Sequence, residues 1–175
     1  MKKDSLGLVH VYTGNGKGKT TAALGQAMRA AGHGYKILII QFMKGRTYGE
    51  LVSARKLKNI KIVQSGTDEF VCKGNLKKKD IDLAARGMRA AEKAINGMKY
   101  DIVILDEINV AMDFGLVPTK DVAKLVKNRP DKVELILTGR NAPKDILKLA
   151  DLVTEMKEVK HPYRKGIECR KGIEW

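Results

Sequence analysis

The residue types best suited to chemistry gather in one segment near the start of the chain, TGNGKGKTT at positions 13–21. Its glycines can adopt positive φ, which lets main-chain N–H groups surround phosphate oxygens. A helix starting near Lys19 would direct the positive end of its dipole at the same oxygens. Lys19 would add a positive charge and Thr20 a hydroxyl ligand for Mg²⁺, so the segment predicts a phosphate-binding loop. The candidate nucleotide contacts are Gly14, Asn15, Gly16, Lys17, Gly18, Lys19, Thr20 and Thr21.

The loop departs from the usual P-loop formula at its first glycine. That formula, G-x-x-x-x-G-K-[ST], requires glycine five residues before Gly18, where this chain has Thr13. Gly14 is the nearest candidate, and it leaves the loop one residue short. We therefore expect the phosphates to be held somewhat differently from those in an ordinary NTPase. The alternative is a glycine-rich turn between a strand and a helix that binds nothing.

Two adjacent carboxylates, Asp106 and Glu107, follow the apolar run at 101–105. A strand there would deliver both to the edge of a sheet, which is how P-loop proteins hold Mg²⁺ beside the phosphates. Acidic pairs also occur by chance at strand ends. Together with the glycine loop, however, this pair predicts a joint metal and nucleotide site. The candidate metal ligands are Thr20, Asp106 and Glu107.

Basic residues follow two other predicted strands. Lys44 and Arg46 come after the apolar run at 36–42, and Arg140 comes after the run at 133–137. Ligands of open α/β sheets gather beyond the carboxyl ends of the strands, so all three are candidate anion contacts. For Lys44 and Arg46 a solvated loop is the alternative. The guanidinium of Arg140 could bind a phosphate or a carboxylate through two hydrogen bonds.

Apolar patterns along the chain alternate between short strands and amphipathic helices. Strands are expected at 8–12, 36–42, 60–63, 101–105, 133–137 and 152–156. Helices are expected after the glycine loop and at 49–58, 81–95, 109–114, 119–128 and 143–149, with Thr119 as an N-cap. Because right-handed crossovers join such strands in parallel, we predict one α/β domain spanning 1–175, of the P-loop, RecA-like type. Its mostly parallel sheet would carry helices on both faces.

Three further segments have distinct predictions. His10 falls inside the first strand, where a packed and hydrogen-bonded role is favoured over catalysis. The polar loop at 65–79 contains Phe70 and Cys72 and is long enough to be a candidate lid over a site. A near-duplication, RKGIEC at 164–169 and RKGIEW at 170–175, predicts either a basic, strand-like tail or a flap over a ligand.

Composition limits the classes of protein to consider. The chain has 175 residues, 43% of them hydrophobic, and a formal net charge of +14, which attracts polyanions such as nucleotide phosphates, nucleic acid or an acidic protein. A solvated, lysine-rich surface is the alternative for most of this excess charge. No apolar run approaches the roughly 18–20 residues that cross a bilayer, and no signal segment follows the start, so we expect a cytosolic protein without membrane contact. Cys72 and Cys169 form no C-x-x-C pair, so they predict neither a metal site nor a disulfide framework.

At this point the chain resembles the ATP:corrinoid adenosyltransferases, which convert cobalamin, cobinamide or cobyrinic acid a,c-diamide to the adenosyl form. The resemblance covers nearly the whole chain and rests on six motifs. These are GNGKGKTT at 14–21, QFMKG at 41–45, LDE at 105–107, TGR at 138–140, ADLVTE at 150–155 and GIE at 172–174. The shortened glycine loop is itself part of the family pattern. The resemblance implies a homodimer that binds ATP in the reverse of the usual P-loop orientation, with the γ-phosphate deep in the loop.

The resemblance also implies a reaction. The Co(I) of the reduced corrinoid substrate attacks C5′ of ATP and expels triphosphate, so no Ser, Cys or general base is needed. By analogy Lys19, the loop amides and Mg²⁺, or Mn²⁺ in its place, would hold the triphosphate. Thr20 and Glu107 would bind the metal with Asp106 in support, and Arg29 matches an arginine that contacts the nucleoside.

Family members carry the sequence Gly-Phe-Thr-Trp in the lid loop, where the two aromatic residues displace the lower axial ligand of cobalt. This chain has EFVC at 69–72. Phe70 keeps the first aromatic residue and is therefore a candidate catalytic residue with Lys19. Cys72 stands where Trp is common, so the preferred corrinoid is left open.

Two rival functions remain at the level of sequence. A RecA-like ATPase acting on nucleic acid would also use Asp106 and Glu107, but nucleic acid is disfavoured because few aromatic residues are available to stack bases. A non-catalytic nucleotide-binding regulator is the other. The +14 charge further suggests that an acidic flavoprotein, as the reductant that produces Co(I), docks on the basic surface.

Overall fold

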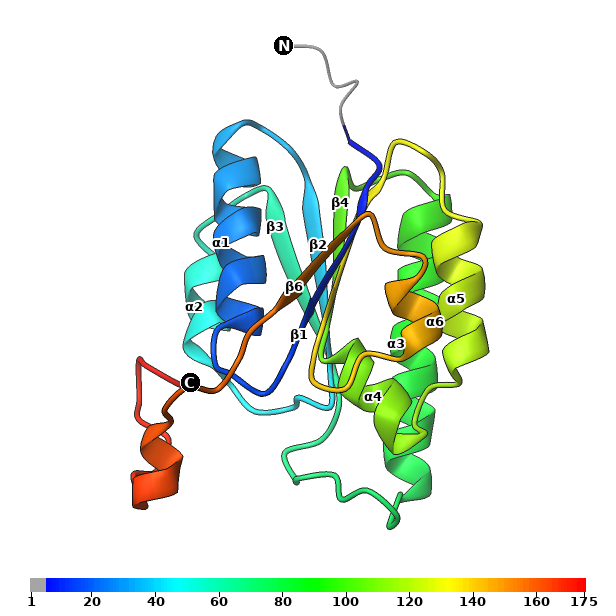
Figure 1. The fold of residues 1–175 in the computed structure, drawn as a ribbon. Coiled ribbons are helices and arrows are strands. Elements are labelled where there is room, and N and C mark those ends of the chain that lie inside the picture. The colour runs from blue at the N-terminus through cyan, green and yellow to red at the C-terminus, as the bar shows by residue number, and fades with distance from the viewer. Residues whose placement is uncertain (1–5) are drawn as a thin grey trace.

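A computed structural model describes residues 6–175, which form a single six-stranded parallel sheet with helices on both faces (Figure 1). The strand order is β3-β2-β4-β5-β1-β6, and every neighbouring pair runs parallel. The strands are β1 (Val9–Thr13), β2 (Ile37–Phe42), β3 (Ile60–Ser65), β4 (Ile102–Asp106), β5 (Glu134–Thr138) and β6 (Leu152–Glu155). The predicted fold class and all six strands are therefore confirmed.

The helices divide between the two faces of the sheet (Figure 1). One face carries α1 (Lys19–Gly32) and α2 (Gly49–Ala54). The other carries α3 (Lys78–Asn96), α4 (Ile108–Phe114), α5 (Thr119–Lys127) and α6 (Lys144–Leu147), and a 3₁₀ helix, η1 (Pro162–Lys165), follows the last strand. No helix within residues 6–175 is both long and apolar enough to cross a membrane.

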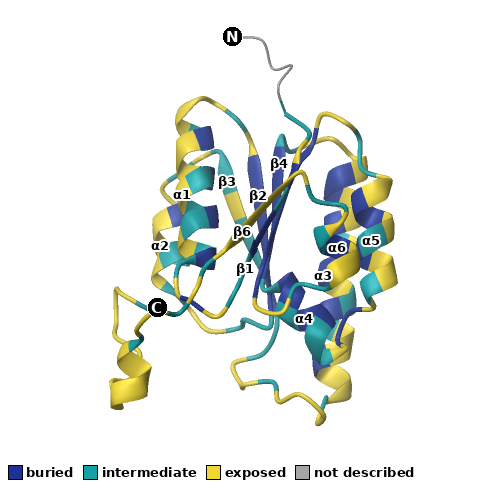
Figure 2. Cartoon of the chain, in the orientation of Figure 1, coloured by how far each residue is buried: buried dark blue, intermediate teal, exposed yellow. Residues whose placement is uncertain are grey.

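The central strands supply the core because they are apolar on both sides. All residues of β2, β4 and β5 are buried, whereas all four residues of the edge strand β6 are exposed (Figure 2). Each fully buried Ile or Leu contributes roughly 1.5–3 kcal/mol relative to an exposed one. The sheet is thus a rigid platform, and its carboxyl edge holds side chains in fixed positions.

Two helices turn small residues toward this platform. The buried face of α1 consists of Ala23, Ala27 and Ala30. In α3, a Cβ on Gly87 would lie 2.6 Å from Ser65 Oγ and 2.8 Å from Phe42 Cε1, so only glycine fits there. The close approach of α3 fixes the base of the loop that connects β3 to it.

Two local predictions are wrong. Thr119 is the first residue of α5, and the N-cap is Pro118, whose fixed φ of −63° already suits a helix start. The segment after β6 is not strand-like, because it turns into η1 and then a further turn instead of extending along the sheet. Gly166 and Gly172 adopt φ of 74° and 76° there, and such left-handed residues break an extended chain.

Candidate active site

The phosphate-loop region is the segment 14–18 with the start of α1. Gly18 is the N-cap of α1 with φ 118°, and no side chain caps the helix. The first N–H groups of a helix lack intrahelical acceptors, so this end of α1 is open to an anion. The confirmed strand β1 and helix α1 give the loop the strand-to-helix context that the sequence predicts.

Lys19 turns its ammonium back into the loop. Its Nζ donates to the carbonyl oxygens of Gly14 at 2.8 Å and Gly16 at 2.6 Å, and the residue is 7% exposed. Burial lowers the pKa of Lys19, an effect that the carboxylate of Glu107 opposes. A partly desolvated cation beside an uncapped helix start creates a positive potential that favours an anion.

The outer side of the loop packs tightly against the chain that follows β6. The Gly16 N–H donates to the carbonyl of Met156, just beyond β6, at 2.7 Å. A Cβ on Gly14 would lie 2.4 Å from that same carbonyl oxygen, and one on Gly16 would lie 2.7 Å from Lys157 O. The loop therefore packs directly against the main chain that follows β6, and neither Gly14 nor Gly16 has room for a side chain.

Asp106, at the end of β4, is the centre of a hydrogen-bond network. Its Oδ1 accepts from Thr20 Oγ1 at 2.8 Å and Thr138 Oγ1 at 2.7 Å. Its Oδ2 accepts from Lys44 Nζ at 2.8 Å and Gln41 Nε2 at 3.4 Å. The carboxylate is 1% exposed and has donors on both oxygens, so it is locked in place.

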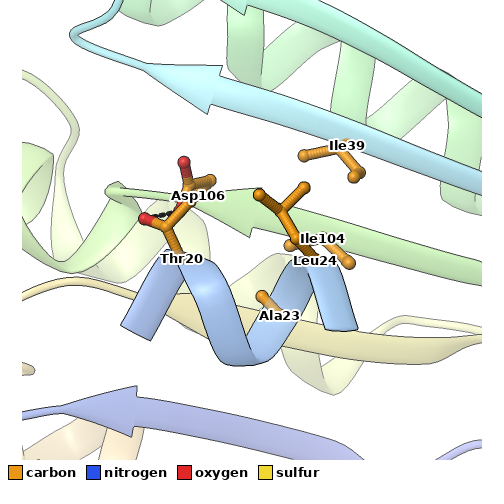
Figure 3. A pocket seen from close by; sticks show the side chains of 6 residues that line it. All are labelled: Thr20, Ala23, Leu24, Ile39, Ile104 and Asp106. Atoms are coloured by element: carbon orange, nitrogen blue, oxygen red, sulfur yellow. Dashed lines mark hydrogen bonds between the residues drawn. The ribbon is translucent and has the colours of Figure 1, made fainter. Parts of the chain in front are cut away.

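Figure 3 shows the bond between Thr20 and Asp106 at the mouth of a narrow cleft between α1 and the sheet. The cleft floor is apolar and comes from α1, β2 and β4. The lining residues are Thr20, Ala23, Leu24, Ile39, Ile104 and Asp106. The polar atoms are thus confined to the end of the cleft that meets the phosphate loop.

Glu107 differs from its neighbour. It adopts φ 62° as the N-cap of α4, and its N–H donates to Thr138 Oγ1 at 3.0 Å. Within residues 6–175 no hydrogen-bond donor contacts its carboxylate. Burial, followed by the negative charge of Asp106, raises the pKa of Glu107, while the cations of Lys44, Lys19 and Arg140 act in the opposite direction. A carboxylate held in a strained backbone conformation without a donor is available to a ligand.

Lys44 is directed at the protein itself. Its Nζ pairs with Asp106 Oδ2 at 2.8 Å, and the same atom lies 4.0 Å from Glu50 Oε1 and 5.3 Å from the ring centroid of Tyr48. Burial alone would lower the pKa of Lys44, but the surrounding carboxylates raise it. Lys44 therefore neutralises Asp106 and leaves Glu107 as the less compensated acid.

The lid segment, residues 66–77 between β3 and α3, lies at the same end of the sheet as the phosphate loop (Figure 1). Phe70 is 89% exposed, and the guanidinium of Arg46 lies 5.5 Å from its ring centroid. Lys73 Nζ bonds Asp113 Oδ1 at 2.8 Å, which ties the segment to α4. A small hollow lies beneath it, lined by Met43, Ser65, Gly66, Val71, Asp80, Ala84 and Leu116.

The remaining candidates lie at different distances from the loop. Arg140 follows β5, and its charge acts on both Lys19 and Glu107, so the fold brings it to the site. Arg29 lies exposed in the last turn of α1, ten residues and thus about 15 Å along the helix from Lys19. Arg46 donates to the carbonyl of Asp68 at 2.8 Å and supports the lid segment. Cys72 is exposed in the same segment.

Sequence reasoning missed Thr138, Gln41 and Asp113. Thr138 and Gln41 are polar residues within apolar strands, a signal that would have marked them as facing a buried partner. Asp113 bonds both Lys73 and, through Oδ2 at 3.0 Å, Asn141 beside Arg140. Nothing local distinguishes it from other acidic residues of a helix.

The geometry defines a class of protein. A glycine loop between the first strand and an uncapped helix, facing a strand-end carboxylate across a parallel sheet, is the arrangement of P-loop α/β proteins.

Comparison with known proteins narrows this class to one family. Residues 5–175 match the sequence profile of the ATP:corrinoid adenosyltransferase BtuR/CobO/CobP family. A corrinoid adenosyltransferase of Sinorhizobium is 34% identical, with 99% of this chain and 83% of the relative covered. The corrinoid adenosyltransferase of Escherichia coli K12 is 33% identical over 99% and 88%. Corrinoid adenosyltransferase CobA of Salmonella typhimurium is 31% identical over 99% and 88%.

The chain therefore belongs to the ATP:corrinoid adenosyltransferase family, whose members are transferases. The family resemblance seen in the sequence motifs is confirmed. The rival reading as a RecA-like ATPase acting on nucleic acid is not favoured by these relatives.

Proposed function

We propose that this protein transfers the 5′-deoxyadenosyl group of ATP to the Co(I) of a reduced corrinoid and releases triphosphate. The observation that carries the proposal is the buried Lys19 ammonium beside the uncapped start of α1, with Glu107 and Arg140 within electrostatic range. The family of the chain and the names of its relatives support the two substrates. In the reaction the Co(I) electron pair forms a bond to C5′, the bond from C5′ to the triphosphate oxygen breaks, and the electrons leave with that oxygen.

The chain's own groups suit the departure of a highly charged leaving group. Lys19 would exchange its two carbonyl contacts for phosphate oxygens, and the N–H groups at the start of α1 would bind others. Asn15, Thr21 and the main-chain N–H of Lys17 would complete the phosphate contacts, while the Lys17 side chain keeps its bonds to Ile173 and Glu174. Because Co(I) is a strong nucleophile, orientation and charge neutralisation are what the protein must supply.

The residues present also fit Mg²⁺, with Mn²⁺ as a substitute. Thr20 and Glu107 offer hard oxygen ligands, and phosphate oxygens would complete the coordination. Asp106 already has donors on both oxygens, so we assign it to holding Thr20 in position. When bound, the metal would neutralise charge on the triphosphate. Within residues 6–175 no cluster of three His, Cys, Asp or Glu side chains holds a metal by itself.

The lid segment is the proposed contact for the corrinoid, with Phe70 as the aromatic residue that displaces the lower axial ligand. Its 89% exposure leaves the ring available to a large flat substrate.

We further propose that Arg140 contacts phosphate, that Arg29 contacts the nucleoside, and that the enzyme acts as a homodimer in the cytosol. An acidic flavoprotein that docks through the basic surface would supply the electron. If the rate of adenosylation with this flavoprotein as electron donor did not change with ionic strength, the proposed docking would be wrong.

The decisive experiment is anaerobic incubation of the protein with ATP, Mg²⁺ and chemically reduced cobalamin or cobinamide. We expect a light-sensitive cobalt–carbon bond and stoichiometric triphosphate. Release of orthophosphate without a cobalt–carbon bond would instead indicate hydrolysis and would contradict the proposal.

A further inference from the structure

The two copies of the near-duplication behave differently in the fold. In the second copy, Glu174 Oε1 accepts from Lys17 Nζ of the phosphate loop at 2.8 Å, and the same ammonium donates to Ile173 O at 3.0 Å. In the first copy, Glu168 is exposed, and no contact to its carboxylate occurs within residues 6–175. One of two nearly identical hexapeptides therefore reaches the loop, and the other does not.

Glu174 is organised before it meets the loop. Its Oε2 accepts from the Arg170 N–H at 2.8 Å and from Arg170 Nε at 3.3 Å, while Oε1 also accepts from Arg170 Nη2 at 3.1 Å. Gly172 N donates to Trp175 O at 2.7 Å and closes the turn. The bonds from Arg170 and Lys17 lower the pKa of Glu174 to about 2, which keeps its side chain ionised at neutral pH.

The phosphate loop is thus held from outside at two consecutive residues. Gly16 is bound to the main chain at Met156, and Lys17 is bound to residues 173–174. Lys19 bonds carbonyl oxygens within the loop itself. The two lysines consequently have separate partners, and the Lys17 charge is already neutralised by the protein.

We propose that Glu174 is a positioning residue for nucleotide binding, which acts through Lys17 to hold the phosphate loop in its binding shape. The inference deepens the proposed function and rests on it for the identity of the ligand. A loop fixed in advance loses less conformational entropy when phosphate binds. The contact between Glu174 and Lys17, which we call the brace, therefore raises affinity for ATP without touching the reacting atoms.

A double-mutant cycle tests the brace. Lys17→Ala, Glu174→Ala and the double variant are compared for Mg²⁺·ATP affinity by isothermal titration calorimetry, with Glu168→Ala as the matched control from the first copy. We expect each single change to weaken binding about 3- to 10-fold, because exposed charge-assisted pairs are individually modest. The double variant should bind Mg²⁺·ATP no more weakly than the single variant with the lower affinity. Glu168→Ala should bind Mg²⁺·ATP as the wild type does. Additive losses, or equal losses in the control, would overturn the proposal.

Glu174→Gln and hydrogen exchange separate positioning from general stability. Gln keeps an acceptor for Lys17, so its ATP affinity should lie between those of wild type and Glu174→Ala, with kcat unchanged at saturating ATP. By reciprocity, ATP should slow amide exchange across residues 170–175. Faster exchange there would mean that phosphate takes Lys17 away from Glu174, and the brace would be wrong.

The outcome is distinguishable from failure of the proposed function. Coupling in ATP binding without any adenosylation by the wild-type protein would leave the brace intact and refute the reaction. Normal adenosylation with no coupling would refute the brace alone.

Discussion

Two glutamates at opposite edges of the same sheet, buried Glu134 and half-buried Glu107, show how this protein separates folding from function. Glu134 begins β5 at the amino edge, where its carboxylate accepts from Gly7 N at 2.7 Å and Leu8 N at 2.8 Å and pairs with His10 Nε2 at 2.9 Å. Glu107 follows β4 at the carboxyl edge, where its carboxylate contacts no donor among residues 6–175. The prediction that His10 is packed and hydrogen-bonded is confirmed.

The difference appears in the direction of the two pKa shifts. Burial would raise the pKa of Glu134, but the bonds from His10, Gly7 and Leu8 bring it below the ordinary value. For Glu107 burial prevails and the pKa rises. At the amino edge the Glu134 carboxylate therefore anchors the start of β1. At the carboxyl edge the Glu107 carboxylate is left without such a partner and can bind a cation.

The largest expected effect tests the carboxyl edge. Lys19→Ala removes the cation that lies nearest the open start of α1, so we expect adenosylation to fall about 100-fold or more. The thermal midpoint should stay within a few degrees of wild type, since Lys19 bonds only loop carbonyls. Activity assays and differential scanning calorimetry measure both quantities. Wild-type turnover would contradict the assignment of the loop.

The next prediction compares a Glu→Gln substitution at each of the two edges. Glu107→Gln should weaken Mg²⁺-dependent ATP binding at least 10-fold while leaving stability equal or slightly higher, because it removes a buried charge without a donor. Glu134→Gln should cost about 1–3 kcal/mol of unfolding free energy, because two N–H groups and His10 lose a charged acceptor. Urea unfolding and calorimetry distinguish the two. If the variants exchanged phenotypes, the proposed division between edges would be wrong.

Stability should depend on pH in opposite directions at the two sites. Glu134, with its lowered pKa, contributes stability above its unfolded value near 4.5 that is lost as pH falls through the folded value. Glu107, with its raised pKa, destabilises the nucleotide-free protein above its folded value, and this cost disappears as pH falls below 4.5. Unfolding free energies of each Gln variant from pH 3 to 7 should differ from wild type with opposite signs.

The smallest effect on stability belongs to the lid segment. Phe70→Ala should change unfolding free energy by no more than about 0.5 kcal/mol, since the ring is 89% exposed. ATP affinity should also be retained, and the loss should appear only in the rate with a corrinoid that carries a lower axial ligand. Cobinamide serves as the matched substrate, because it lacks the nucleotide base. Equal losses with both corrinoids would remove the proposed role of Phe70.

Local patterns predicted the elements well because each buried strand is a continuous apolar run and each helix has one apolar face. They also brought Thr20 and Asp106 together, since both follow strands whose carboxyl ends share an edge. The partners Thr138 and Gln41 depend on β5 and β2 being the neighbours of β4, an order that no local pattern specifies. The contact between Lys17 and Glu174 spans 157 positions and joins an exposed lysine to a half-buried glutamate, so neither spacing nor apolarity marks it.

The contact of Gly14 and Gly16 with the main chain after β6 limits how this loop can change. A side chain at Gly14 or Gly16 would collide with the main chain of Met156 or Lys157, so these loop positions and the end of β6 can be altered only together. Converting this scaffold to bind nucleotides as ordinary NTPases do would require a coordinated redesign of two segments about 140 positions apart in the chain.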